Sequence, residues 1–179
     1  MTNKRKQTPG QAQPCTPDLS DPAERLERLL TDTENLLGLT ITVHDRTGLF
    51  VNRQGRSLLN SRRGWHRHAY CQLGRQPNSE YDRNCYAHCQ QFVNGTLLKR
   101  LSPFLHRCWK GAVEAAVPIT REGRHLATLF AGPVKLAGQE AFAASASFPA
   151  PVQAAHAALP VWTAVRLESA GRVLEVLGR

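Results

Sequence analysis

The first hydrophobic pattern in the chain predicts an amphipathic helix. Leucines recur at helical spacing through PAERLERLLTDTENLL, and charged residues occupy the opposite face. The start is marked by Asp21 at the N-cap, Pro22 at the first helical position and Glu24 at the third. Gly38 follows the last leucine, and glycine is the residue that most often ends a helix. We therefore expect a helix over residues 22–37.

Two segments predict β-hairpins. Residues 39–52 alternate β-branched and polar side chains around a turn over residues 45–48. Further along, apolar runs over residues 106–120 and 125–134 are joined by the turn sequence REGR, residues 121–124. Because the strands of a hairpin are antiparallel, these runs predict an antiparallel sheet.

The run over residues 106–120 has two different faces. Alternate apolar residues share one face, whereas Glu114 points to the other. The apolar members are Val113, Ala115, Val117 and Ile119. Pro118 cannot donate a hydrogen bond to a neighbouring strand, so we expect the strand to be bulged or at a sheet edge there.

Two further helices are expected, over residues 79–93 and 161–177. The first carries Cys85 and Cys89 on one face and is expected to end at Gly95. The apolar side of the second comprises Trp162, Val165, Val173 and Leu177. The Ala- and Pro-rich segment that precedes the second helix is only weakly helical.

The composition is that of one globular domain preceded by a tail. The chain has 179 residues, of which 41% are hydrophobic and 21% charged. Residues 1–20 are basic and polar and predict a disordered tail. We expect the folded domain over residues 21–137 and a helical extension over residues 138–179. Because neither a membrane span nor a signal peptide is visible, we expect a cytoplasmic protein without a membrane partner.

Positive charge is concentrated in the middle of the chain. The formal net charge is +9, and residues 51–110 contain eleven Lys and Arg but only Glu80 and Asp82 as acidic residues. Such a field attracts nucleic acid or another anionic partner. The alternative is an arginine-rich surface that is simply solvated.

Four of the five cysteines lie within 38 residues, accompanied by histidines. Thiolates and imidazoles together are what zinc or an iron–sulfur cluster requires, and a chain without an export signal keeps its thiols reduced. Cys85 and Cys89, four apart on one helix face, can share one metal ion. Cys71 and Cys108 flank that helix in sequence and are expected as the other two ligands.

Other roles for this cysteine cluster remain open. His68 or His106 could replace either of the two distant cysteines as a metal ligand. Without a metal ion, the cysteines would line a pocket as small apolar side chains or carry out redox chemistry. A nucleophilic pair such as His106 with Cys108 lacks an oxyanion hole and a third orienting group, so we do not expect an enzyme.

Aromatic side chains surround the cysteine cluster. Most are expected to be core residues, but a binding pocket is expected where apolar walls meet a few polar groups. Glu114 beside Trp109 is the candidate polar contact to a ligand, and a solvent-facing Glu114 is the alternative. His106 and Tyr70 are further candidate ligand-binding residues.

The runs WHRHAYCQLGR, NCYAHC and HRCWKGAVEAAVPITREGRHLATLFAGPV resemble the PocR-type sensory domain of bacterial transcription regulators and sensor kinases. The matching positions are Cys71, Cys85, Cys89, Cys108, Gly111, Glu114, Pro118, Ile119 and Gly132. The resemblance implies an α+β fold, a PAS-like antiparallel β-sheet flanked by helices. It also implies binding of a small organic molecule, such as a simple alcohol, and an output domain. No AraC-type helix-turn-helix or kinase follows Arg179, so the output domain is expected to be missing or on another chain.

Two functional hypotheses follow. The first is a cytoplasmic small-molecule-sensing domain of a transcription-regulatory or signalling system, with the cysteines as a metal site or a pocket wall. The second is a basic nucleic-acid-binding protein with a structural zinc site. The expected partners are a small organic ligand and an output domain or DNA-binding partner. The last helix could also form a homodimer.

Overall fold

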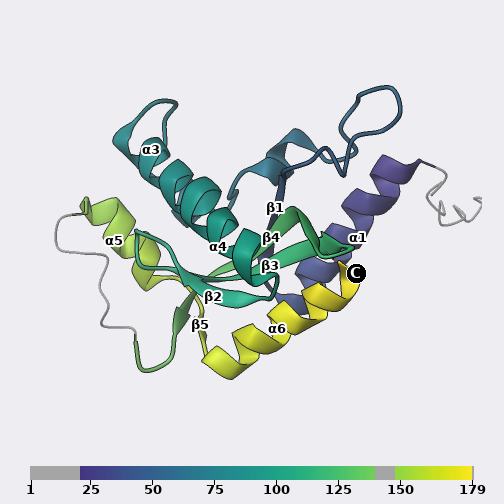
Figure 1. Cartoon of the computed structure of the whole chain (residues 1–179). Coiled ribbons are helices and arrows are strands. Elements are labelled where there is room, and N and C mark those ends of the chain that lie inside the picture. The colour runs from purple at the N-terminus through teal and green to yellow at the C-terminus, as the bar shows by residue number, and fades with distance from the viewer. Residues whose placement is uncertain (1–20, 140–147, 179) are drawn as a thin grey trace, which may run out of the picture.

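The computed structural model describes residues 21–139 and 148–178 (Figure 1). The predicted tail over residues 1–20 and part of the Ala- and Pro-rich segment lie outside these ranges. Four antiparallel strands form a sheet in the order β1-β4-β3-β2. Their bounds are β1 Thr40–Asp45, β2 Phe104–Arg107, β3 Val113–Arg121 and β4 Arg124–Leu136. A short fifth strand, β5 Val161–Trp162, pairs in parallel with the end of β4.

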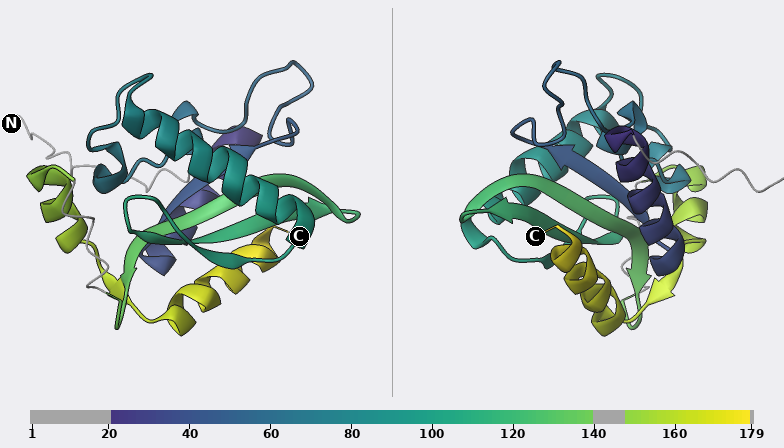
Figure 2. Two further views of the ribbon diagram at one scale, coloured as in Figure 1. Left: turned by 60° about the vertical axis from the view of Figure 1, so that its left-hand side comes forward. Right: turned by 90° about the vertical axis from the view of Figure 1, so that its right-hand side faces the viewer.

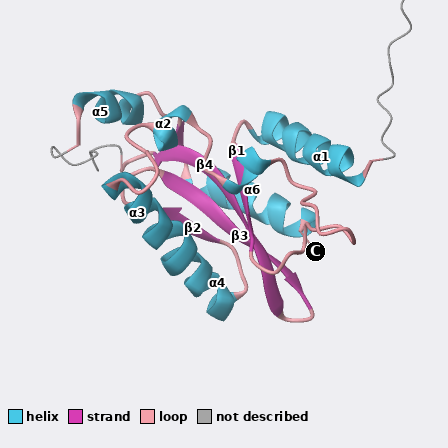
Figure 3. Cartoon of the chain, turned by 90° about the horizontal axis from the view of Figure 1, so that it is seen from above, coloured by secondary structure: helices cyan, strands magenta, loops and turns pink. Residues whose placement is uncertain are grey.

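Helices cover both faces of this sheet. Their bounds are α1 Pro22–Leu37, η1 Ser61–Gly64, α2 Ala69–Gln72, α3 Glu80–Tyr86, η2 Ala87–Val93, α4 Asn94–Arg100, α5 Ala150–Ala157 and α6 Ala164–Leu177. The consecutive helices α3, η2 and α4 form one continuous helical segment that crosses one face of the sheet, and α6 crosses the opposite face (Figure 2). From above, α1 lies beside β1, and α5 lies next to α2 (Figure 3). This antiparallel sheet with flanking helices is the α+β fold expected from the sequence.

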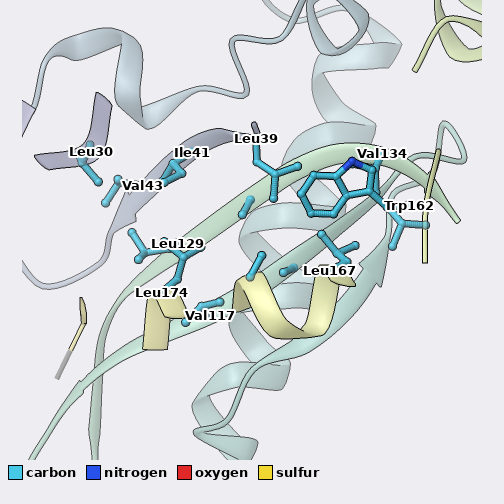
Figure 4. Packing of buried hydrophobic residues seen from close by; sticks show 14 of the residues in the cluster. Leu30, Leu39, Ile41, Val43, Val117, Leu129, Val134, Trp162, Leu167 and Leu174 are labelled. Atoms are coloured by element: carbon cyan, nitrogen blue, oxygen red, sulfur yellow. The ribbon is translucent and has the colours of Figure 1, made fainter. Parts of the chain in front are cut away.

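The main apolar core lies between the sheet and α6, with α1 at its edge (Figure 4). Ile41 of β1, Leu129 of β4 and Leu174 of α6 are among its buried members. The predicted faces of β3 are confirmed, because its alternate apolar residues belong to or pack against this core while Glu114 lies on the other face. Within the described ranges, no helix is long and apolar enough to cross a membrane.

The first helix begins and ends as predicted. Asp21 accepts a hydrogen bond of 2.9 Å from the backbone N–H of Ala23, and Pro22 occupies the first helical position. Gly38 ends the helix with φ of +67°, a left-handed conformation that glycine adopts without steric cost. Both ends are therefore determined by residues local in sequence.

The hairpin between β3 and β4 is also confirmed. Its turn residues, Glu122 and Gly123, both have positive φ angles, 52° and 72°, as a two-residue hairpin turn of type I′ requires. Pro118 lies beyond Ala116, the last residue of β3 that pairs with β2. The strand therefore has an unpaired edge at this proline, as predicted.

The hairpin predicted over residues 39–52 is wrong, because only its first half forms a strand. The carboxylate of Asp45 accepts hydrogen bonds from four successive backbone N–H groups, those of residues 47–50. These bonds hold the chain in a turn and leave Val51 with only an isolated bridge to Ser57. β1 pairs instead with β4, which is distant in sequence.

The single strand predicted over residues 106–120 is two strands. β2 ends at Arg107, and the chain turns back through residues 108–111 before β3 begins. The turn is closed by hydrogen bonds from Cys108 N to Ala112 O and from Gly111 N to Cys108 O. Gly111 has φ of +96°, which explains why glycine is needed in a sequence that otherwise resembles a continuous strand.

The predicted ends or faces of two helices are also wrong. The helix expected to end at Gly95 continues to Arg100, because Val93 and Leu97 pack against the sheet and offset the low helix propensity of glycine. In α6 the buried side is formed by Leu167, Ala170 and Leu174, whereas Val165 is exposed. The expected apolar side was misplaced because the chain first forms β5, so that Trp162 is buried outside the helix.

Candidate functional site

A cavity of about 190 Å³ lies against the sheet face that carries Glu114, under α3 and η2. His44 of β1 and Glu114 of β3 form its floor, and the segment before α2 adds Trp65 and His66. Side chains alternate along a strand, so each floor residue is the sequence neighbour of a core residue. The same strands therefore build the core on one face and this site on the other.

All four predicted cysteines line this cavity. They come from four elements: α2, α3, η2 and the turn between β2 and β3. Trp109 also lines the cavity and donates a hydrogen bond of 3.4 Å from Nε1 to Cys85 Sγ. Cys89 lies in the π-helical segment η2, a wider helical turn that is often found at functional sites.

Glu114 reaches the cavity because the sheet is irregular at this point. β4 has one extra residue opposite Glu114, at Gly132–Pro133, and such bulges redirect side chains. A Cβ atom at Gly132 would lie 2.7 Å from Glu114 Cγ and 3.0 Å from Val113 O. Only glycine leaves room for the glutamate, which is 3% exposed.

The carboxylate of Glu114 pairs with His66. Its Oε1 lies 2.9 Å from His66 Nδ1, while its Oε2 and His66 Nε2 are buried without a hydrogen-bond partner. Burial acts to raise the pKa of Glu114, but the charge and the hydrogen bond of His66 outweigh it and hold that pKa below its usual value. Glu114 is therefore a carboxylate with one oxygen free to accept a further bond.

His66, Cys71 and Glu114 bring possible metal ligand atoms within 4.8 Å of one another. Within residues 21–139 and 148–178, this is the one such group of three or more histidine, cysteine, aspartate or glutamate residues. Of the four cysteines expected to share a metal ion, the group contains only Cys71. His66 was not predicted, and its only signal was its place between Trp65 and Cys71 in a run rich in histidine.

The thiols of Cys71, Cys89 and Cys108 are held in their neutral form. Burial raises the pKa of Cys71 and of Cys89, and the nearby Glu114 carboxylate adds to this effect. The same two causes raise the pKa of Cys108 to about 12. At neutral pH these thiols are protonated, and a bound cation would be needed to make them thiolates.

Lys110 fixes the position of α2 and thus of Cys71. Its buried ammonium donates hydrogen bonds to the carbonyls of Tyr70 and Cys71, at 2.8 and 3.2 Å, and lies 4.7 Å from the centre of the Tyr70 ring. Burial lowers the pKa of Lys110. The carbonyl end of a helix attracts positive charge, so this lysine stabilises the short helix.

The remaining predicted residues lie beside the cavity. Tyr70 is buried behind its wall, and its hydroxyl donates to Lys110 O. His106 pairs directly across the sheet with Glu114 and contacts the ring of His88. His68 caps α2 by accepting a hydrogen bond from Tyr70 N. The residues that line this cavity do not include Tyr70, His106 or His68, whereas they do include Trp109 and Glu114.

Part of the positive charge that is concentrated in residues 51–110 is paired with carboxylates or buried. Arg63 is 1% exposed and lies 2.7 Å from carboxylates of both Glu27 and Glu34 of α1. Arg67 also pairs with Glu34, Arg75 pairs with Asp82 at 2.9 Å, and Lys110 is buried. These four cations contribute little to an exposed positive surface.

The fold and the site define a class of domain. An antiparallel sheet flanked by helices borders a small cavity with a few polar groups. Residues 22–179 match the family model described as "Sensory domain found in PocR". The chain therefore belongs to the PocR sensory-domain family, and the matched range includes β5 and α6. Comparisons with curated proteins and with solved structures found no match.

Proposed function

We propose that the cavity binds a small organic molecule and that the domain senses it on behalf of a transcription-regulatory or signalling system. One observation carries the proposal: the buried carboxylate of Glu114 has an unpartnered oxygen at the wall of a mostly apolar cavity. A buried acceptor without a partner costs free energy. A guest that donates a hydrogen bond to Glu114 removes that cost.

The size and the lining of the cavity limit the guest. A dry cavity of about 150 Å³ in another protein binds benzene, so about 190 Å³ accommodates a molecule of similar size. Trp65 and Trp109 supply apolar walls, while Glu114 accepts a hydrogen bond. A short alcohol or diol, with a hydrocarbon body and a hydroxyl donor, combines both properties.

A route from the cavity to the rest of the domain runs through β3. Glu114 faces the cavity, while its neighbour Ala115 faces α6, where a Cβ built on Gly171 would lie 3.5 Å from the Ala115 Cβ. A second route follows the chain from His66 back to Arg63, three residues earlier, which pairs with the glutamates of α1. A guest that moves Glu114 or His66 therefore changes the packing of α6 or α1, either of which could contact an output domain.

Calorimetric titration with matched guests tests the proposal. The panel contains alcohols and diols of two to six carbons and, as controls, hydrocarbons of the same size. We expect the hydroxyl compounds to bind and Glu114→Gln to weaken binding about tenfold or more, because a hydrogen bond to a charged group contributes about 1.5–3 kcal/mol. Thermal unfolding with and without guest provides an independent measure of binding.

Two results would contradict this function. Equal binding of hydrocarbons and alcohols would show that Glu114 does not select the guest. Unchanged affinity in Glu114→Gln would have the same meaning. Strong binding of duplex DNA that weakens steeply with added salt would instead support a nucleic-acid-binding protein.

A further inference from the structure

We propose that His66, Cys71 and Glu114 bind a divalent metal ion, with Zn²⁺ the best match, at the wall of the cavity. The three side chains come from the segment before α2, from α2 and from β3. Imidazole, thiolate and carboxylate are the three ligand types that zinc accepts in proteins. The site differs from a centre made of the four cysteines, in which Cys71 would be joined by three other sulfur atoms.

The geometry is close to what a metal ion needs. Zinc bonds of about 2.0–2.3 Å at tetrahedral angles place neighbouring ligand atoms about 3.5 Å apart. The ligand atoms of His66, Cys71 and Glu114 already lie within 4.8 Å of one another. The separations between these atoms would have to shorten by at most about 1.3 Å, from 4.8 to about 3.5 Å, for all three to bind one ion.

The hydrogen bonding of the site is incomplete without a cation. Glu114 pairs with His66 through Oε1 alone, and its Oε2 is left buried with no partner. The side chains are only 4% and 11% exposed, so water does not freely replace the missing bonds. A cation beside Glu114 would use a lone pair of the carboxylate that this pairing leaves idle.

The surrounding residues hold the three ligands in place. Lys110 anchors the backbone of Cys71, and the bulge at Gly132 aims Glu114 toward the cavity. Three protein ligands leave the fourth tetrahedral position open, as in zinc sites that bind a water or a substrate. All three residues line the cavity, so this position faces the guest. This part of the inference rests on the proposed function, because the fourth ligand would be the hydroxyl of the guest, bound directly to the metal.

Titration of metal-free protein with Co²⁺ alone tests the site. Cobalt replaces zinc in such sites, and a thiolate bound to Co²⁺ gives a charge-transfer band in the near ultraviolet. We expect one Co²⁺ per chain, displaced by Zn²⁺, with a band of the intensity of a single thiolate. Cys71→Ser should lose the band, and His66→Gln and Glu114→Gln should each weaken Co²⁺ binding at least tenfold.

Cys89→Ser is the matched control, because Cys89 lines the same cavity and is as buried as Cys71, 8% against 7% exposed. The Cys89→Ser variant should retain the charge-transfer band and the Co²⁺ affinity of the wild-type protein. Far-ultraviolet circular dichroism checks that each variant folds; if Cys71→Ser does not, the His66 and Glu114 variants still decide the question.

Three results would overturn the metal site. These are no Co²⁺ binding by the wild-type protein, equal loss of the band in Cys89→Ser, or unchanged affinity in Glu114→Gln. Because no organic molecule is present in this titration, its failure would leave the sensing function intact. Conversely, a guest that binds the metal-free protein through Glu114 would support sensing without the metal.

Discussion

The two faces of the sheet are built from the same strands but have opposite character. The face toward α6 is packed with aliphatic side chains such as Val117, Leu167 and Leu174. The other face carries His44 and Glu114, and the four cysteines lie over it around a cavity. The first face therefore supplies stability, and this allows the second to keep polar groups with unsatisfied bonds. Substitutions that affect one face and spare the other test this division.

The largest effect is expected for Leu174→Ala on the core face. Leu174 is 1% exposed within the main core, and truncation of such a leucine lowers the free energy of unfolding by about 2–5 kcal/mol. Cys89→Ala on the cavity face removes a side chain that borders empty space and should cost clearly less. Urea unfolding of both variants gives the comparison, and equal losses would contradict the division.

Gly132→Ala should disturb the cavity face from within the sheet. The new methyl group would meet Glu114 and the carbonyl of Val113, an overpacking that costs about 1–3 kcal/mol. Because Glu114 must move, guest affinity should also fall. Gly95→Ala is the control: nothing lies within 4 Å of its added Cβ, and in a helix alanine should raise stability by up to about 1 kcal/mol. Unaltered stability and guest binding in Gly132→Ala would show that Glu114 does not depend on this glycine.

Acid should weaken the cavity face selectively. Burial lowers the pKa of His106 to about 4, although Glu114 opposes this, and it lowers the pKa of His44 to about 3. Between those values and about 6.5, the unfolded chain binds protons that the folded chain does not. The free energy of unfolding should therefore fall as the pH drops below 6.5, by about 1 kcal/mol at pH 5.5 for His106 alone.

Thermal unfolding at pH 7.5 and 5.5 measures this loss. His106→Leu should reduce the difference between the two pH values by about the same amount, while Leu174→Ala should leave it unchanged. An equal pH dependence in His106→Leu and the wild-type protein would show that His106 is not held neutral by burial.

The smallest effect is expected for Cys85→Ser. A serine hydroxyl can accept the hydrogen bond that Trp109 now donates to Cys85 Sγ, so the loss in stability should be about 0.5 kcal/mol. Ala115→Ser places the same hydroxyl in the core face, where burial without a partner costs about 1–3 kcal/mol. Denaturant unfolding measures the loss in the free energy of unfolding for Cys85→Ser and for Ala115→Ser. Equal costs would mean that the cavity face is packed as tightly as the core.

Local signals in the sequence predicted the features that depend on local interactions. Asp21 and Gly38 set the ends of α1, and Glu122 with Gly123 set the β3–β4 turn, because each acts within a few residues. The pairing of β1 with β4 was missed because it joins segments more than 80 residues apart. The turn that Asp45 organises was missed because its carboxylate, not a backbone pattern, ends the strand.

The candidate site was also predicted only in part, because some of its features depend on local sequence and others on contacts between distant segments. The density of cysteines pointed to the part of the chain that lines the cavity, and all four cysteines line it. Glu114 was identified because it interrupts an apolar strand. His66 was missed because its pairing with Glu114 spans 48 residues and depends on the path of an irregular segment. Sequence spacing could therefore indicate which residue types gather, but not which ligand atoms meet.

The close contact between Glu114 and Gly132 also constrains how this family can evolve. A lineage that keeps the glutamate cannot drift to a larger residue at position 132 without disrupting the strand pairing. A lineage that replaces the glutamate with a smaller residue relaxes the constraint, so that alanine or serine becomes more acceptable at position 132. Aligned relatives should therefore show the two positions co-varying, although 18 residues separate them along the chain.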